Sequence, residues 1–372
     1  MGKGNSGYIP ELDGLRAIAV LEVMLVHQGI LFVPIPWGFN LFFVLSGFLI
    51  TGILIDARNS PYYFRNFYIR RALRIFPIYY LTLGVLIVAG LALQWNLGDA
   101  IHYVIYAQNY VLGWKSMNAD FPLLFTHSWS LAVEVQFYLV WPFIILAFSG
   151  RRLVAFLILL FLSAPLSRFL MYYTVGQSFL LYTSLPAQAD SLAVGGLLAI
   201  MVRSERARGS VARKAVLVAA AAMAAIALLL FLAGPNPYGD PAALFFLGPG
   251  NVLILSLLSL LLGSVLILSI SRETPLSSLL RNRWLRGIGK ISYGLYLYHL
   301  PIFFSVFSIA IPVYRIFPGA NLNWVRLILI TLGFGLSFVC AILSWHFIES
   351  PISTLKNQFG WSPQRETLLP AR

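Results

Sequence analysis

The chain has 372 residues, of which 59% are hydrophobic and only 10% are charged. Soluble domains carry about 25% charged residues because their surface faces water, so this composition excludes a soluble enzyme and predicts a protein covered largely by lipid. The formal net charge is +13, but the arginines stand in short clusters between apolar runs, which is typical of loops at the cytoplasmic face of a membrane and argues against a nucleic-acid-binding face.

Ten apolar runs follow one another along the chain, and each is close to the roughly 20 residues that a membrane-spanning helix needs. They cover residues 14–33, 38–57, 75–95, 128–149, 151–172, 181–203, 214–233, 251–271, 291–314 and 325–348. Residues 99–113 are too short and too polar to cross alone, so we expect a surface or re-entrant helix there. The sequence therefore predicts an all-α, polytopic membrane helix bundle of about ten transmembrane helices, formed as a single domain over residues 1–372 with a polar tail at 352–372.

The distribution of basic residues predicts the orientation of this bundle. With ten crossings both termini lie on one side, and that side holds 21 of the 26 Lys and Arg residues. Basic residues favour the cytoplasmic side of a membrane. We therefore expect both termini in the cytoplasm.

Ionisable side chains inside the predicted spans indicate a hydrophilic interior, because each costs roughly 2.5–3.5 kcal/mol to insert. Arg16 and His27 are eleven residues apart in the first span, which places them on one helix face and about 16 Å apart along its axis. Glu134 in the fourth span lies at about the depth of His27, about 9 Å below the outer surface. A histidine beside a carboxylate forms a base with its orienting partner, although a buried packing network explains these two residues as well.

The remaining ionisable residues of the predicted spans are less informative. They include Glu22, Arg168, Asp190 and His299, and the sequence assigns no role to Glu22 or Asp190. His127, at the outer mouth and two residues before Trp129, is a candidate for lining an entry.

The segment YIRRALRIFP, residues 68–77, forms a basic cluster at the cytoplasmic end of the third span. Arg71 and Arg74 lie on adjacent helical turns, and guanidinium groups grip phosphate oxygens in pairs. Anchoring to lipid headgroups is the alternative. In the second span, Ser46 and Gly47 interrupt an aromatic run, and such small residues let a second helix or a thin ligand chain approach closely.

Motifs of soluble catalytic sites are absent from the sequence. There is no Walker-type loop, HExxH pair or GxSxG elbow, and the single cysteine, Cys340, excludes a multi-cysteine zinc site, so we expect no metal. The residues alone therefore predict a membrane protein with a His-Glu-Arg interior and leave its reaction open. A secondary transporter of an anionic or proton-coupled substrate and a scaffold without chemistry are the alternatives.

Seven segments together resemble the acyltransferase-3 family of bacterial integral membrane O-acyltransferases. In chain order they are YIPELDGLRAIAVLEVMLVHQG (8–29), GFNLFFVLSGFLITG (38–52), RRALRIFPIYYL (70–81), HSWSLAVEVQFYLVWP (127–142), QADSLAVGG (188–196), SYGLYLYHLPIF (292–303) and HFIESP (346–351). The first segment fits the family's Arg-x10-His pattern with Arg16 and His27. The chain departs from the family at Asn40, where an Asp is common, and at Val135, where a second Glu is common.

The resemblance implies a multi-pass enzyme of the bacterial inner (plasma) membrane that transfers an acyl group, commonly acetyl. The co-substrate would be acyl-CoA, with acetyl-CoA as the default, and the acceptor a hydroxyl of a carbohydrate, a glycolipid or a macrolide. His27 would be catalytic, with Arg16 also essential. Arg71 and Arg74 would help bind the donor, and Ser46 and Glu134 would line the site. The oligomeric state is not implied.

These residues suggest a route for the donor. Coenzyme A carries phosphates and cannot enter lipid, so we expect it to dock at the cytoplasmic arginines while its pantetheine arm reaches towards His27. His27 would take the proton of the acceptor hydroxyl, and Glu134 would hold the imidazole in the required tautomer.

Overall fold

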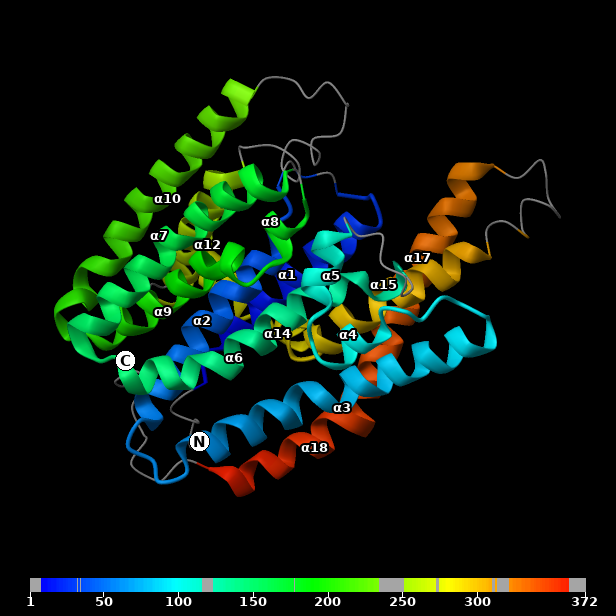
Figure 1. The fold of residues 1–372 in the computed structure, drawn as a ribbon, viewed down its shortest axis with the longest axis horizontal. Helices are drawn as coiled ribbons and strands as arrows, with labels where there is room; N and C mark the ends of the chain where they lie inside the picture. The colour runs from blue at the N-terminus through cyan, green and yellow to red at the C-terminus, as the bar shows by residue number, and fades with distance from the viewer. Residues whose placement is uncertain are drawn as a thin grey trace.

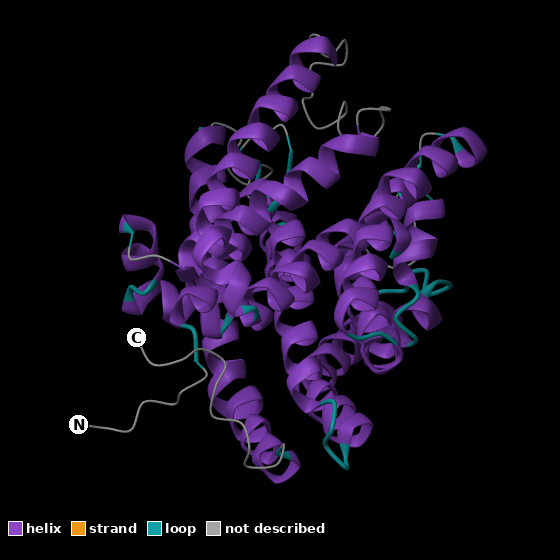
Figure 2. Cartoon of the chain, turned by 90° about the vertical axis from the view of Figure 1, so that its left-hand side faces the viewer, coloured by secondary structure: helices purple, strands orange, loops and turns teal. Residues whose placement is uncertain are grey.

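The computed structural model describes residues 8–31, 33, 35–115, 123–176, 178–233, 251–271, 274–309, 312 and 321–360. Within these ranges every regular element is a helix (Figure 2), as the sequence predicts. The long helices are α1 (Pro10–His27), α2 (Gly38–Ala57), α3 (Tyr63–Ala92), α6 (Trp129–Ala147), α7 (Gly150–Val175), α9 (Ala189–Arg203), α10 (Glu205–Ala233), α12 (Asn251–Ser271), α15 (Ser292–Ser308) and α17 (Leu322–Ser344). Shorter helices connect or extend them: α4 (Ala100–Val104), α5 (Gln108–Trp114), η1 (Leu123–Ser128), α8 (Leu180–Thr183), η2 (Pro186–Gln188), α13 (Pro275–Leu280), α14 (Arg283–Lys290), η3 (Trp345–Glu349), α18 (Ser350–Leu355) and η4 (Lys356–Phe359).

Seven helical stretches in the described part of the chain are long and apolar enough to cross a membrane. They are α2, α3, η1 with α6, α7, α10, α12 and the run from α17 to η4. The three other predicted spans correspond to α1, which carries four Asp, Glu or Arg residues, and to α9 and α15, which have 15 and 17 residues. The chain is thus a multi-pass helical membrane protein. The count of ten and the cytoplasmic location of the termini remain predictions, and residues 1–7 and 361–372, including most of the polar tail, lie outside the described residues.

The predicted boundaries differ from the structure at two helices that bear on the site. Helix α3 begins at Tyr63, well before the predicted start at 75, so the basic cluster belongs to the helix itself. The predicted span 181–203 was wrong as one helix: α8, η2 and α9 divide it, because Pro186 lacks the backbone N–H that a continuous helix would need. Residues 99–113 form the two short helices α4 and α5, in keeping with a segment that does not cross alone.

Helix α1 lies in the middle of the bundle and packs against α2, α14 and α15 (Figure 1). Helices α7, α9, α10 and α12 gather on the side of α2, whereas α15 and α17 pair on the other side. Helix α18 runs along α3, where the Arg70 side chain donates to the carbonyl of Lys356 at 3.0 Å. Side chains from α1, α2, α3, α6 and α15 can therefore meet in the interior.

Helices α2 and α9 cross closely at two glycines. A Cβ atom at Gly47 would lie 2.2 Å from the carbonyl oxygen of Leu192, and one at Gly195 would lie 2.2 Å from that of Val44. No larger side chain fits at either position. Close helix packing therefore accounts for the small residue Gly47 in the aromatic run of α2.

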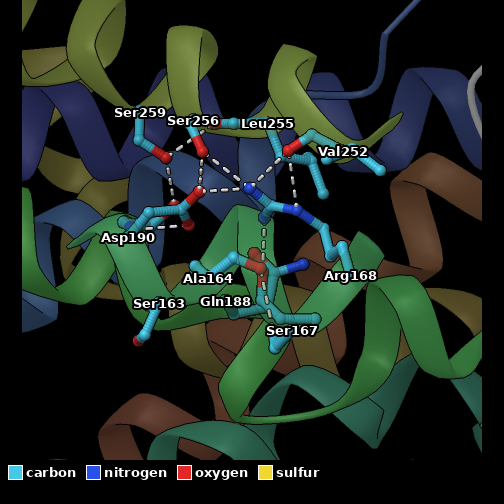
Figure 3. Close-up of polar contacts among 12 residues, drawn as sticks. Ser163, Ala164, Ser167, Arg168, Gln188, Asp190, Val252, Leu255, Ser256 and Ser259 are labelled. Atoms are coloured by element: carbon cyan, nitrogen blue, oxygen red, sulfur yellow. Dashed lines mark hydrogen bonds and ion pairs between the residues drawn. The ribbon is translucent and has the colours of Figure 1, made fainter. Parts of the chain in front are cut away.

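Arg168 and Asp190 form an ion pair that is completely buried between α7, α9 and α12 (Figure 3). Arg168 Nη2 lies 2.8 Å from Asp190 Oδ2 and 2.6 Å from Ser256 Oγ, and it also donates to the carbonyl of Val252. Arg168 Nη1 donates to the carbonyl of Ala187, and Ser256 donates to Asp190. This network satisfies both charges and ties three helices together, which gives Asp190 a structural role.

Glu22 supports the start of α2. Its carboxylate accepts hydrogen bonds from the backbone N–H groups of Trp37 at 2.9 Å and Gly38 at 3.0 Å. The first N–H groups of a helix have no partner within the helix and carry partial positive charge. A buried carboxylate from α1 therefore caps α2 and fixes the two helices relative to each other.

Candidate active site

Residues from five helices surround one interior cavity of about 770 Å³. Three of the side chains that line it are cationic: Arg16 of α1, and Arg71 and Arg74 of α3. The other lining residues are Phe42, Phe43, Leu45, Ser46, Leu49, Ile50, Ile75, Ser130, Leu131, Glu134, Tyr138, Ser292, Tyr293 and Tyr296. We call this space the arginine cavity. Its mixture of apolar walls with a few charged groups is typical of a site for a small organic molecule.

Arg16 is held in place by its own helix. Its guanidinium lies 2.9 Å from Asp13, one turn earlier, and Asp13 also accepts a 2.6 Å hydrogen bond from the Tyr8 hydroxyl. Partial burial and this bond to Asp13 raise the pKa of Tyr8, so the hydroxyl stays protonated and keeps donating. The arrangement orients Arg16 while leaving part of its guanidinium to face the cavity.

Arg71 and Arg74 form no ion pair within the described residues. The Arg71 guanidinium lies over the rings of Phe67 and Tyr138, at 5.9 and 5.7 Å from their centroids, and its Nε atom is buried without a hydrogen-bond partner. A buried donor of this kind is costly unless a ligand satisfies it. These two arginines therefore fit an anionic group.

A second cavity adjoins the first on the side of α14 and α18. Arg16 and Arg74 line both cavities, and Lys290 and Lys356 line the second. Its volume is about 640 Å³. Four basic side chains thus line one or both of the two cavities, and two carboxylates also line the second.

Glu134 is the carboxylate of the arginine cavity. It accepts hydrogen bonds from the hydroxyls of Ser46 on α2 and Tyr138 on its own helix. Ser46 and Glu134 therefore contact each other in the lining of the arginine cavity. By accepting these two hydrogen bonds, the Glu134 carboxylate holds the side chains of Ser46 and Tyr138 in place next to Arg71.

Three histidines form a cluster outside the arginine cavity. His27, the last residue of α1, is exposed, whereas His299 of α15 and His127 of η1 are buried. His27 Nδ1 lies 3.0 Å from His299 Nε2, and the two rings are stacked with centroids 5.1 Å apart. The ring of His127 lies edge-on to His299 at 4.9 Å. Even so, within the described ranges no three His, Cys, Asp or Glu side chains are placed to hold a metal ion.

Tyr296 separates the histidine cluster from the arginine cavity. Its side chain lines the cavity, and its ring lies 5.2 Å from His127 and 5.8 Å from His299. Its hydroxyl donates to the carbonyl of His127 at 2.5 Å and lies 2.6 Å from Ser130 Oγ. One aromatic ring thus stands between the cationic cavity and the residues around His27.

The structure gathers five of the six predicted site residues in one place. Arg16, Ser46, Arg71, Arg74 and Glu134 line the arginine cavity, and His27 lies beyond Tyr296. The expected pairing of His27 with Glu134 differs from the structure, in which His27 contacts His299. Equal depth in two helices does not fix the direction around each helix axis, and α6 turns Glu134 towards α2.

Two residues next to the site, His299 and Tyr296, were not assigned a role from sequence, whereas His127 was predicted to line an entry. His299 and Tyr296 lie three residues apart on α15, and His127 precedes α6. The segment SYGLYLYHLPIF contained the signal, because a histidine and a tyrosine one turn apart share a face of an otherwise apolar helix.

Comparisons with known proteins identify the family of the chain. A family model described as an acyltransferase domain matches residues 9–346. The peptidoglycan O-acetyltransferase OatA of Listeria monocytogenes is 32% identical over 95% of this chain and 56% of its own length. The putative peptidoglycan O-acetyltransferase YrhL of Bacillus subtilis is 33% identical over 93% of this chain and 55% of its own length.

The O-acetyltransferase OatA of Staphylococcus aureus is 28% identical over 93% of this chain and 57% of its own length. The chain thus spans a little over half the length of these curated relatives. No solved structure matches the chain significantly. The match of the family model over nearly the whole chain, together with relatives above 30% identity, shows that this multi-pass membrane protein belongs to the acyltransferase-3 family of bacterial integral membrane O-acyltransferases.

Proposed function

We propose that this acyltransferase transfers an acetyl group from acetyl-CoA to a hydroxyl group of a cell-wall glycan. The observation that carries the proposal is the arginine cavity, in which Arg71 and Arg74 form no ion pair with the described residues and Arg71 Nε lacks a hydrogen-bond partner. Phosphate groups satisfy such guanidinium donors in pairs. Coenzyme A supplies the acetyl group as an activated thioester.

The basic residues divide into two parts that suit the two ends of the donor. Lys290 and Lys356, on the side of α14 and α18, are placed for the outermost phosphate. Arg71 and Arg74 are placed for the phosphates nearer to the cavity, and the mostly apolar walls beyond them suit a pantetheine arm. Tyr296 then stands at the end of the cavity that faces the histidine cluster.

His27 is the general base of the proposed reaction. It takes the proton of the acceptor hydroxyl while the oxygen attacks the acyl carbon, and it returns that proton to the departing thiol sulfur. Because His27 is exposed at the end of α1, an acceptor reaches it without passing the cationic cavity. Arg16, on the same helix, belongs to the donor side.

The acceptor is proposed from the relatives. Two of them are named for peptidoglycan, a carbohydrate polymer, which favours a glycan over a glycolipid or a macrolide. The chain covers only 55–57% of the length of these relatives. The acceptor therefore belongs to the proposal and not to the family assignment.

The test uses the full chain in lipid nanodiscs with radiolabelled acetyl-CoA and a soluble oligomer of β-1,4-linked N-acetylglucosamine. We expect label on the oligomer as a base-labile ester. Hydrolysis of acetyl-CoA without labelled oligomer would retain the donor and reject the glycan. A folded protein that neither binds nor consumes acetyl-CoA would overturn the proposal and favour a transporter.

A further inference from the structure

His27 and His299 form a hydrogen-bonded pair whose protons follow from their surroundings. The nitrogen atoms involved are His27 Nδ1 and His299 Nε2, at 3.0 Å. One of them must donate and the other accept, because neutral imidazole carries a proton on only one nitrogen. The remaining contacts of His299 decide which nitrogen donates.

His299 is oriented by the backbone of its own helix. Its Nδ1 atom lies 2.7 Å from the carbonyl oxygen of Tyr296 and 3.2 Å from that of Leu295. Carbonyl oxygens only accept hydrogen bonds, so Nδ1 of His299 carries the proton. Nε2 of the neutral ring then has a free lone pair. The ring is completely buried and lies edge-on to His127 and Phe303, which holds this orientation.

This arrangement sets the tautomer of His27. Since His299 Nε2 accepts, His27 Nδ1 must donate, and the lone pair of His27 lies on Nε2. We propose that His299 is a positioning residue, which holds His27 in the Nδ1–H tautomer and leaves Nε2 as the base for the acceptor hydroxyl. The inference rests on the proposed function and replaces Glu134 by His299 as the partner of His27.

The same bond serves while the proton is transferred. When His27 Nε2 takes the hydroxyl proton, the ring becomes positive, and its Nδ1–H donates a charge-assisted and therefore stronger hydrogen bond to His299. The acceptor oxygen forms its bond to the acyl carbon, the carbon–sulfur bond breaks, and the sulfur receives the proton from Nε2. His299 stays neutral throughout, as its complete burial favours.

The direct test measures which ring nitrogen of His27 carries the proton. The chain has 5 histidines, so ¹⁵N-histidine labelling of the full chain in nanodiscs gives few imidazole signals, and the His27→Gln variant assigns those of His27. We expect His27 to be protonated on Nδ1 and unprotonated on Nε2. In the His299→Phe variant, which keeps a ring but removes the acceptor, we expect a mixture of both tautomers. His27 protonated on Nε2 in the wild type, or an unchanged tautomer in His299→Phe, would overturn the proposal.

Kinetics supply a second readout. In His299→Phe we expect kcat to fall about 10- to 100-fold, as for loss of a hydrogen bond to a charged group, with the KM for acetyl-CoA unchanged. His299→Gln, whose amide oxygen accepts at a similar position, should recover part of this loss. A parallel rise of KM in both variants would mean a structural role for His299. Should the wild type transfer no acetyl group, the proposed function would fail, while the tautomer measurement would still decide the pairing.

Discussion

The hydroxyl group of Tyr296 donates a 2.5 Å hydrogen bond to the main-chain carbonyl of His127. This bond holds the tyrosine ring between the arginine cavity and the histidine cluster. In the proposed reaction, a ring in this place would keep water from the side of the histidines away from the thioester of the donor, as closed active sites do. In that reaction the ring would also have to turn aside for the acyl group to reach His27.

Replacing Tyr296 is therefore expected to uncouple the consumption of acetyl-CoA from the transfer of its acetyl group to the acceptor. In Tyr296→Ala, the ratio of acetyl-CoA hydrolysis to acetyl transfer should rise, because water enters from the side of the histidines. Tyr296→Phe keeps the ring and serves as the matched variant, with a ratio close to that of the wild type. Both rates are measured with and without the oligosaccharide acceptor. An unchanged ratio in Tyr296→Ala would show that the ring is no barrier.

Removing the arginine side chains of the cavity is expected to weaken binding of the acyl donor. Arg71→Ala and Arg74→Ala should each raise the KM for acetyl-CoA about 10- to 100-fold, since each removes hydrogen bonds to a charged group. Arg65→Ala is the matched control: this exposed arginine lies on the same helix over the ring of Tyr62, outside the cavity. Equal KM values for all three variants would leave these arginines as lipid anchors.

Much of the fold was predictable because a helix that crosses lipid needs about 20 mostly apolar residues in a row. The predicted span 38–57 coincides with α2, and 251–271 coincides with α12. This length requirement does not hold for helices that are surrounded by other helices. A short helix such as α9 or a charged helix such as α1 does not need to match the lipid thickness. The apolar length also did not predict that α3 would begin at Tyr63, because the first turns of α3 are basic.

The candidate site was only partly predictable for a related reason. Arg16, Arg71 and Arg74 came from motifs, and the structure brings them to one cavity. The partner of His27 could not come from spacing, because helical periodicity gives the depth of a residue and its face relative to its own helix only. Whether Glu134 or His299 meets His27 depends on how α6 and α15 are rotated against α1, which long-range packing decides.

The ion pair of Arg168 and Asp190 makes a prediction about stability. Removing one partner, as in Arg168→Met or Asp190→Asn, leaves a buried group uncompensated and should cost about 3–5 kcal/mol. Thermal unfolding of the purified protein in detergent measures this as a lower Tm. Arg203→Ala offers a comparison, because its ion pair with Asp56 is 20–22% exposed and should matter less. Equal losses in the two pairs would contradict the role assigned to the buried network.

Glu134 is expected to act on the donor and not on His27. Its hydrogen bonds run to Ser46 and Tyr138, which line the arginine cavity. Glu134→Gln should therefore raise the KM for acetyl-CoA about tenfold, the size of one hydrogen bond to a charged group. Because Glu134 and His27 share no hydrogen-bond partner, the losses in kcat/KM should multiply in the double variant with His27→Ala. A double variant no worse than His27→Ala alone would restore the pairing predicted from sequence.

His27 carries the proposed chemistry, and its removal is expected to affect turnover alone. A general base typically supplies 10²- to 10⁴-fold, so His27→Ala should lower kcat by about that factor. Acetyl-CoA should still bind, because the arginine cavity does not include His27. Binding is followed by calorimetry and turnover by the labelled ester, each normalised to folded protein. His346→Ala is the control, since this exposed histidine of η3 lies outside the site and contacts the carbonyl of Ile342 in the preceding helix α17. If His27→Ala retained normal turnover, the base would have to be sought elsewhere in the histidine cluster; if it also lost donor binding, His27 would belong to the donor site and not to the acceptor side.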